Sequence, residues 1–262
     1  MSSIDIRPRV RTPVLARRSS QLRGREFTEL TIVYAMILLA LWIDKPTQLA
    51  IGAVTMIYVI ARTLSSRQSS RELGLAPRLG LTSLWIAGAA LGCGAVLVTT
   101  AARLHTLHLN GHGAAPAKSI AAYLAWSLLQ QFVLLDFFLL RLRRLLTNVR
   151  AAVIVTATLF AAAHLPNPLL TMATLIWGTI AAALFLRHRN LYVLALAHAV
   201  LGLSLAVSVP NAIHHNMRVG LGYQEWRSPR AVQRSHRNQM VSTEAWVMAE
   251  ATRRCSHRQA LP

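Results

Sequence analysis

The chain of 262 residues combines a formal net charge of +19 with a hydrophobic content of 54% and only 14% charged residues. Basic disordered tails and soluble nucleic-acid-binding proteins owe their charge to a polar composition, so this balance excludes both classes. Mean hydropathy is +0.41, and long stretches of the chain carry no charge, which indicates a membrane protein. We expect membrane lipids around it and no nucleic-acid partner.

The first 26 residues carry seven arginines and precede an apolar run over Phe27–Ile43. This start is similar to the basic region of a signal peptide, but no clear small-residue cleavage site follows, and further apolar runs do. We therefore expect an uncleaved first span, with residues 1–26 as a basic cytoplasmic segment.

The remaining apolar runs are Gln48–Ile60, Leu81–Ala102, Ile120–Leu140, Ala151–Leu165, Leu169–Leu186 and Leu191–Val209. About 20 helical residues cross the hydrocarbon core, so the second and fifth of the seven runs are short for a span. None alternates with the period of two that a transmembrane barrel requires. The sequence predicts an all-α, polytopic transmembrane helical bundle of about seven spans, six to eight, over residues 27–210, with a polar basic tail over 211–262.

The placement of basic residues predicts the orientation of these spans. With a cytoplasmic N-terminus, 17 of the 28 basic residues fall on the cytoplasmic side, and only Lys45, Arg103 and Lys118 fall in outer loops. Such asymmetry follows the positive-inside rule and predicts a multi-pass protein of the cell membrane. Seven crossings would place the eight arginines of the tail outside, a conflict that a further or re-entrant span would resolve.

Few ionisable or amide side chains lie at membrane depth, where an unpaired polar group is costly and suggests function. They are Gln130, Gln131, Asp136, His164 and His198. Each has a structural alternative: the glutamines could hydrogen-bond between helices, and the histidines could bond to backbone. α-Helical spacing places Asp136 on a different face from the glutamines, so we expect it to be a buried acid or to pair with an arginine.

Together these residues from three spans could form one intramembrane site. An imidazole titrates near neutrality and can exchange a proton with a bound water, and histidines with amides can stabilise an oxyanion. Two histidines without a carboxylate are a poor zinc set, and the spacing of His105, His108 and His112 is common by chance. We therefore expect no cofactor.

The spacing of the site resembles the CAAX prenyl endopeptidase type II family, also called the CPBP or Abi intramembrane proteases. The family pattern is Glu-Glu-x-x-x-Arg on one span, then Phe-x-x-x-His, then His-x-x-x-Asn. Phe160 to His164 matches the second motif in full, and His198 follows His164 by 34 residues and matches the first position of the third. The resemblance covers roughly residues 72–205 and includes the Glu-Leu-Gly-Leu phrase at 72–75.

Four other motif positions differ from the family pattern. Gln130 and Gln131 stand where both glutamates belong, Leu135 replaces the arginine, and Gly202 replaces the asparagine. The resemblance implies an intramembrane endopeptidase acting on a membrane protein or a lipidated peptide. His164 would then orient or deprotonate water and His198 would contribute to the oxyanion site. A glutamine cannot take up a proton as the family's glutamate does.

Three functions stay open on the sequence alone. The first is an endopeptidase with an altered base, and the second is a pseudoprotease or scaffold that binds a membrane protein or lipid without cutting it. The third is a small transporter built on the two histidines. Past the last span, the polar stretch over 214–223 predicts either an ordered cap, a headgroup contact or a solvated loop.

Overall fold

The computed structural model describes residues 13–66, 68–76, 80–108 and 116–226, and within these ranges the chain forms helices and turns without any strand. All the helices below lie in the unit that ends at Gln224.

Five helices are long and apolar enough to cross a membrane: α2 (Lys45–Leu64), α3 (Leu81–Arg103), a continuous helix over Lys118–Leu145, α7 (Pro168–His188) and α8 (Leu191–Ser208). The first apolar run lies in α1 (Pro13–Leu41), and the fifth lies in α6 (Val149–Ala162). At 14 residues, α6 rises about 21 Å, less than a full crossing. The prediction of a multi-pass helical membrane bundle is confirmed, with the second run lengthened by its polar flanks to a full span.

The fourth run is not a uniform α-helix. It begins as α4 (Pro116–Gln131), continues as the π-helix η1 (Phe132–Leu139) and ends as α5 (Leu140–Leu145). A π-helix bonds residue i to residue i+5 and is frequent at functional sites, so the α-helical offsets used for Asp136 do not hold here. Most of the η1 side chains are buried, and Leu135, Phe137 and Leu139 are fully inside the core.

Asparagines start three of the helices around the site. The side-chain oxygens of Asn148, Asn167 and Asn190 accept backbone N–H groups in the first turns of α6, α7 and α8. Each cap satisfies a backbone donor that a helix start leaves unpaired. These caps fix where the short loops between the apolar runs end.

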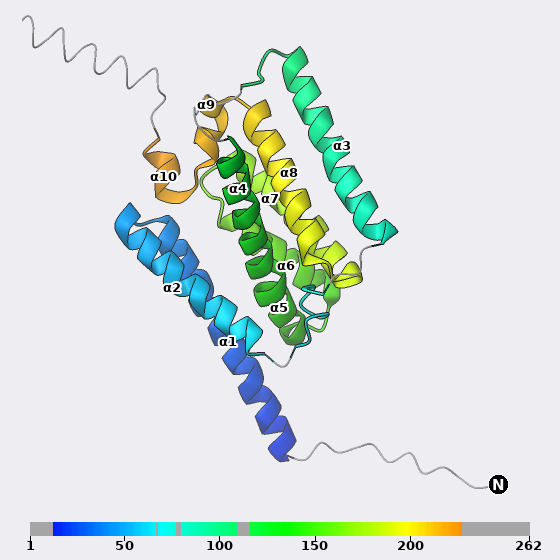
Figure 1. The fold of residues 1–262 in the computed structure, drawn as a ribbon. Helices are drawn as coiled ribbons and strands as arrows, with labels where there is room; N and C mark the ends of the chain where they lie inside the picture. Colours follow the sequence, from blue (N-terminus) through cyan, green and yellow to red (C-terminus); the bar gives the residue numbers. More distant parts are fainter. Residues whose placement is uncertain (1–12, 67, 77–79, 109–115, 227–262) are drawn as a thin grey trace, which may run out of the picture. The chain divides into compact units, whose positions relative to one another are not determined.

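Within this unit, α8 lies between α3 and α4, and α6 packs on α7 (Figure 1). The Glu72–Leu75 phrase docks on the turn between α7 and α8, where the Leu191 N–H donates to the Gly74 carbonyl at 3.2 Å. Gly74 has φ +66°, and a Cβ there would lie 2.8 Å from the ring of Phe185. Only glycine therefore fits this contact.

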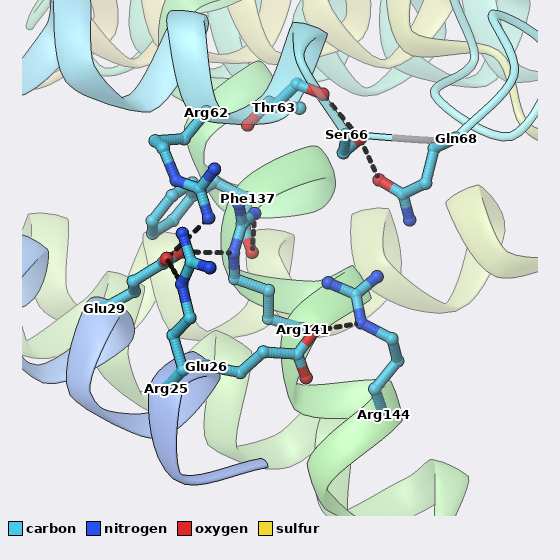
Figure 2. A network of polar contacts seen from close by, with 10 residues as sticks. All are labelled: Arg25, Glu26, Glu29, Arg62, Thr63, Ser66, Gln68, Phe137, Arg141 and Arg144. Carbon is cyan, nitrogen blue, oxygen red and sulfur yellow. Dashed lines mark hydrogen bonds and ion pairs between the residues drawn. The ribbon is translucent and has the colours of Figure 1, made fainter. Parts of the chain in front are cut away.

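A polar network ties the first two helices to α5 (Figure 2). Glu29 of α1 accepts Arg62 of α2 at 2.6 Å and Arg25 at 3.1 Å, and it lies 3.7 Å from Arg141 of α5. Arg141 also donates to the Phe137 carbonyl and lies over the Phe137 ring. One carboxylate therefore joins three helices through their arginines.

The residues after α8 form α9 (Asn211–His214), the 3₁₀ turn η2 (His215–Met217) and α10 (Gly220–Gln224). The Asn167 amide donates to the carbonyls of His214 and Arg218, and the Gly220 N–H donates to the Leu165 carbonyl. Residues 214–223 therefore form an ordered cap, the first of the three structures expected for them, because the segment packs against the turn between α6 and α7.

Candidate functional site

The centre of the site is a hydrogen bond between two buried side chains from different helices. Gln131, the last residue of α4, places its Nε2 2.8 Å from Nδ1 of His198 in the middle of α8. Gln131 is fully buried, and His198 is 8% exposed. Because an amide nitrogen only donates, His198 Nδ1 accepts, and its proton lies on Nε2.

His164 lies just past the end of α6, one turn after Phe160. Its Nδ1 is 2.7 Å from the Phe160 carbonyl oxygen. A carbonyl only accepts, so the neutral ring carries its proton on Nδ1 and leaves Nε2 with a free lone pair. The two histidines therefore have opposite hydrogen-bonding roles at Nε2: His164 Nε2 accepts a hydrogen bond, and His198 Nε2–H donates one.

Aromatic rings hold the two histidines near one another. The Phe160 ring meets the His164 ring edge-on at a centroid distance of 4.8 Å and the His198 ring at 5.9 Å. The ring centroid of Trp177 in α7 lies 6.1 Å from that of His198. The site therefore combines residues of α4, α6, α7 and α8.

Three polar atoms around this centre have no hydrogen-bond partner among the described side chains and backbone: Gln131 Oε1, Trp177 Nε1 and Ser127 Oγ. Buried polar groups in native proteins nearly always pair with protein, water or ligand. A group of unsatisfied atoms beside two histidines suits a polar substrate group or a water.

Residues 113–204 match the family model of the type II CAAX prenyl endopeptidase Rce1-like proteins, and this segment is called the Rce1-like domain below. The family predicted from the motifs is thereby confirmed over roughly a third of the chain, a segment that contains Gln130, Gln131, His164 and His198. No curated protein and no solved structure matches the chain. At the level of the family, the match supports a membrane-embedded peptidase with lipid surroundings and membrane-associated substrates.

The Rce1-like domain has no room for a side chain at residue 202. A Cβ on Gly202 would clash with the Tyr123 hydroxyl oxygen. Gly202 follows His198 by one helical turn, so the phenol of α4 stands where the third motif of the family has its asparagine. The hydroxyl can donate or accept a hydrogen bond there.

Two of the polar residues at membrane depth stand apart from this centre. The Gln130 side chain is half-buried and makes no hydrogen bond within the described ranges. Asp136 of η1 is fully buried, and neither of its carboxyl oxygens has a hydrogen bond or an ion pair in the part of the chain that the structure describes. Of the two expectations for Asp136, it is the buried acid rather than the paired one.

No group of three or more potential metal ligands occurs in the described ranges. Of the outer loop histidines, His105 and His108 are described, whereas His112 lies outside the described residues. His108 Nε2 lies 3.2 Å from the Asn211 side chain, a contact between the end of α3 and the start of α9.

Sequence reasoning missed Tyr123, Ser127 and Trp177 as neighbours of the site. One signal was available: Tyr123, Ser127 and Gln131 recur every four residues, and that spacing places them on one face of α4. This face meets α8, where His198 and Gly202 are also four residues apart. No comparable pattern pointed to Trp177.

Proposed function

We propose that the Rce1-like domain is an intramembrane endopeptidase in which His164 replaces the carboxylate base. The observation that carries the proposal is the pair of hydrogen bonds that leaves His164 with a free Nε2 lone pair and His198 with an Nε2 proton. A base and an oxyanion donor are the two groups that amide hydrolysis by water requires.

In this mechanism, His164 Nε2 accepts a proton from a water as its oxygen attacks the scissile carbonyl carbon. The carbonyl oxygen becomes negative and accepts a hydrogen bond from His198 Nε2–H, with the Tyr123 hydroxyl as a second donor near Gly202. The C–N bond then breaks, and the proton on His164 moves to the leaving amine nitrogen. Gln131 is a positioning residue, because its amide fixes the tautomer of His198.

The exchange of glutamate for glutamine lowers the expected rate. General-base catalysis contributes about 10²- to 10⁴-fold, and a single imidazole bonded to a backbone carbonyl recovers part of this factor. We therefore expect slow turnover rather than none.

The test uses the purified full chain and an internally quenched farnesylated CAAX peptide. Wild-type protein should cleave the peptide, whereas His164→Ala and His198→Ala should each lose at least about 100-fold in kcat/KM. His188→Ala is the matched control, since His188 lies at the far end of α7 and should keep full activity. Cleavage that survives both site substitutions would refute the mechanism.

The Gln131 amide favours a second function, a pseudoprotease that holds a membrane protein or lipid without cutting it, because glutamine has no proton-accepting group. Gln131→Glu distinguishes the two functions. A pseudoprotease shows no cleavage as wild type and gains it only with the glutamate, whereas an endopeptidase already cleaves as wild type.

A further inference from the structure

An apolar groove lies between the first half of α6 and the last half of α7, whereas His164 follows the opposite end of α6. Its volume is about 510 Å³, within the range of small-molecule sites, and its walls include Val153 and Ile154 of α6 and Ala183 and Leu186 of α7. Ile154 is 59% exposed although it lies in the middle of an apolar helix. In a membrane bundle such a surface faces lipid chains.

One end of this groove is strongly positive. Arg150 in the first turn of α6 and Arg187 in the last turn of α7 both line it, and both are exposed. Neither side chain has an ion pair or a hydrogen bond with the residues that the structure describes.

These cations differ from the arginines of the α1–α2–α5 network. There Arg25, Arg62 and Arg141 surround Glu29, and Arg144 lies 2.5 Å from Glu26 (Figure 2). The two groove arginines face no carboxylate among the groove residues, so the positive end of the groove is not neutralised by the protein.

We propose that this groove binds one anionic phospholipid, with the phosphate of its headgroup between Arg150 and Arg187 and an acyl chain along the α6–α7 walls. Apolar walls that end in two cations match a molecule with an apolar chain and an anionic head. Basic residues at the end of membrane helices attract anionic lipids in this way. A free phosphate would leave the apolar walls unmatched, and a partner helix would leave the two charges unmatched.

The experiment measures binding of the first phosphatidylglycerol molecule to the purified full chain by native mass spectrometry, with phosphatidylcholine as the zwitterionic comparison. We expect phosphatidylglycerol to bind more tightly. Arg150→Gln and Arg187→Gln should each weaken its binding about fivefold. Ala183→Trp fills the groove but keeps both charges, and it should weaken binding at least as much. Arg103→Gln, an exposed arginine at the end of α3, should leave binding unchanged.

Four outcomes would overturn the proposal. Phosphatidylcholine binding as tight as phosphatidylglycerol binding would remove the role of charge, and full binding by Ala183→Trp would remove the role of the groove. Competition by inorganic phosphate at equal concentration would indicate a free-anion site. A dimer cross-linked through cysteines placed at Ile154 would indicate a protein partner. None of these readouts depends on peptidase activity, so the proposed function can fail while this proposal stands.

Discussion

The Glu29 network is expected to hold α1 and α2 to the Rce1-like domain, which makes Glu29→Gln the most informative change to stability. Residues 113–204 match the family, whereas Glu29 and Arg62 lie before that segment and Arg141 lies inside it. Glutamine keeps the shape of the side chain and removes its charge.

The expected loss follows from how far each arginine is buried. The Arg25 side chain is 64% exposed and the Arg62 side chain is 34% exposed. Because water screens both ion pairs with Glu29, each contributes about 1 kcal/mol or less to stability. The Arg141 side chain is only 4% exposed, and a buried charge that loses its partner costs about 3–5 kcal/mol. The Phe137 carbonyl and ring still hold Arg141 in the variant, so we expect a total near 3 kcal/mol.

The assay is thermal unfolding of the purified chain in a mild detergent. A loss of 3 kcal/mol lowers Tm by about 6–12 °C for a domain of this size. Glu26→Gln is the control, since its partner Arg144 is 41% exposed, and it should lower Tm by less than about 4 °C. Arg141→Met combined with Glu29→Gln should recover much of the loss, because no buried charge then remains unpaired. Equal Tm values for Glu29→Gln and Glu26→Gln would refute this reasoning.

Further predictions concern the contact between α4 and α8 and the segment after α8. Gly202→Ala should lower stability by about 1–3 kcal/mol in the same Tm assay because the new Cβ meets the Tyr123 hydroxyl, and Tyr123→Phe should recover part of that loss. Gly88→Ala is the control because no atom lies near the position of its Cβ. An equal loss of stability in both alanine variants would contradict the contact. Burial lowers the pKa of His214 from its ordinary value of 6.5, so the neutral ring stabilises the fold above that pH, and stability falls as the pH drops below about 6.5. A Tm that drops equally in wild type and His214→Gln between pH 7 and 5 would contradict this assignment.

The sequence predicts most of the helices because the long apolar runs have the length and composition that a membrane-spanning helix requires. The short second run shows where this fails: α2 covers Lys45–Leu64 because flanking residues such as Lys45 and Arg62 extend the helix beyond its apolar part. The π-helix over Phe132–Leu139 was also not predictable, since nothing in an apolar run distinguishes i→i+5 from i→i+4 bonding.

The candidate site was predicted in part. Motif spacing placed Gln131, His164 and His198 together, and the structure brings them together. The contact between Tyr123 and Gly202 joins α4 to α8 across 79 residues of sequence, and such long-range packing leaves no local pattern. Which nitrogen of each histidine holds its proton depends on partners that only the fold supplies.

The most direct measurement of the proposed chemistry follows the oxygen of the attacking water. Wild-type protein would be incubated with the farnesylated CAAX peptide in ¹⁸O-labelled water, and the products analysed by mass spectrometry under single-turnover conditions. Hydrolysis with His164 as base predicts one ¹⁸O atom in the new carboxyl group for wild type and at least about 100-fold less labelled product for His164→Ala. Labelled product from His164→Ala at the wild-type rate, or none from wild type, would contradict the role of His164.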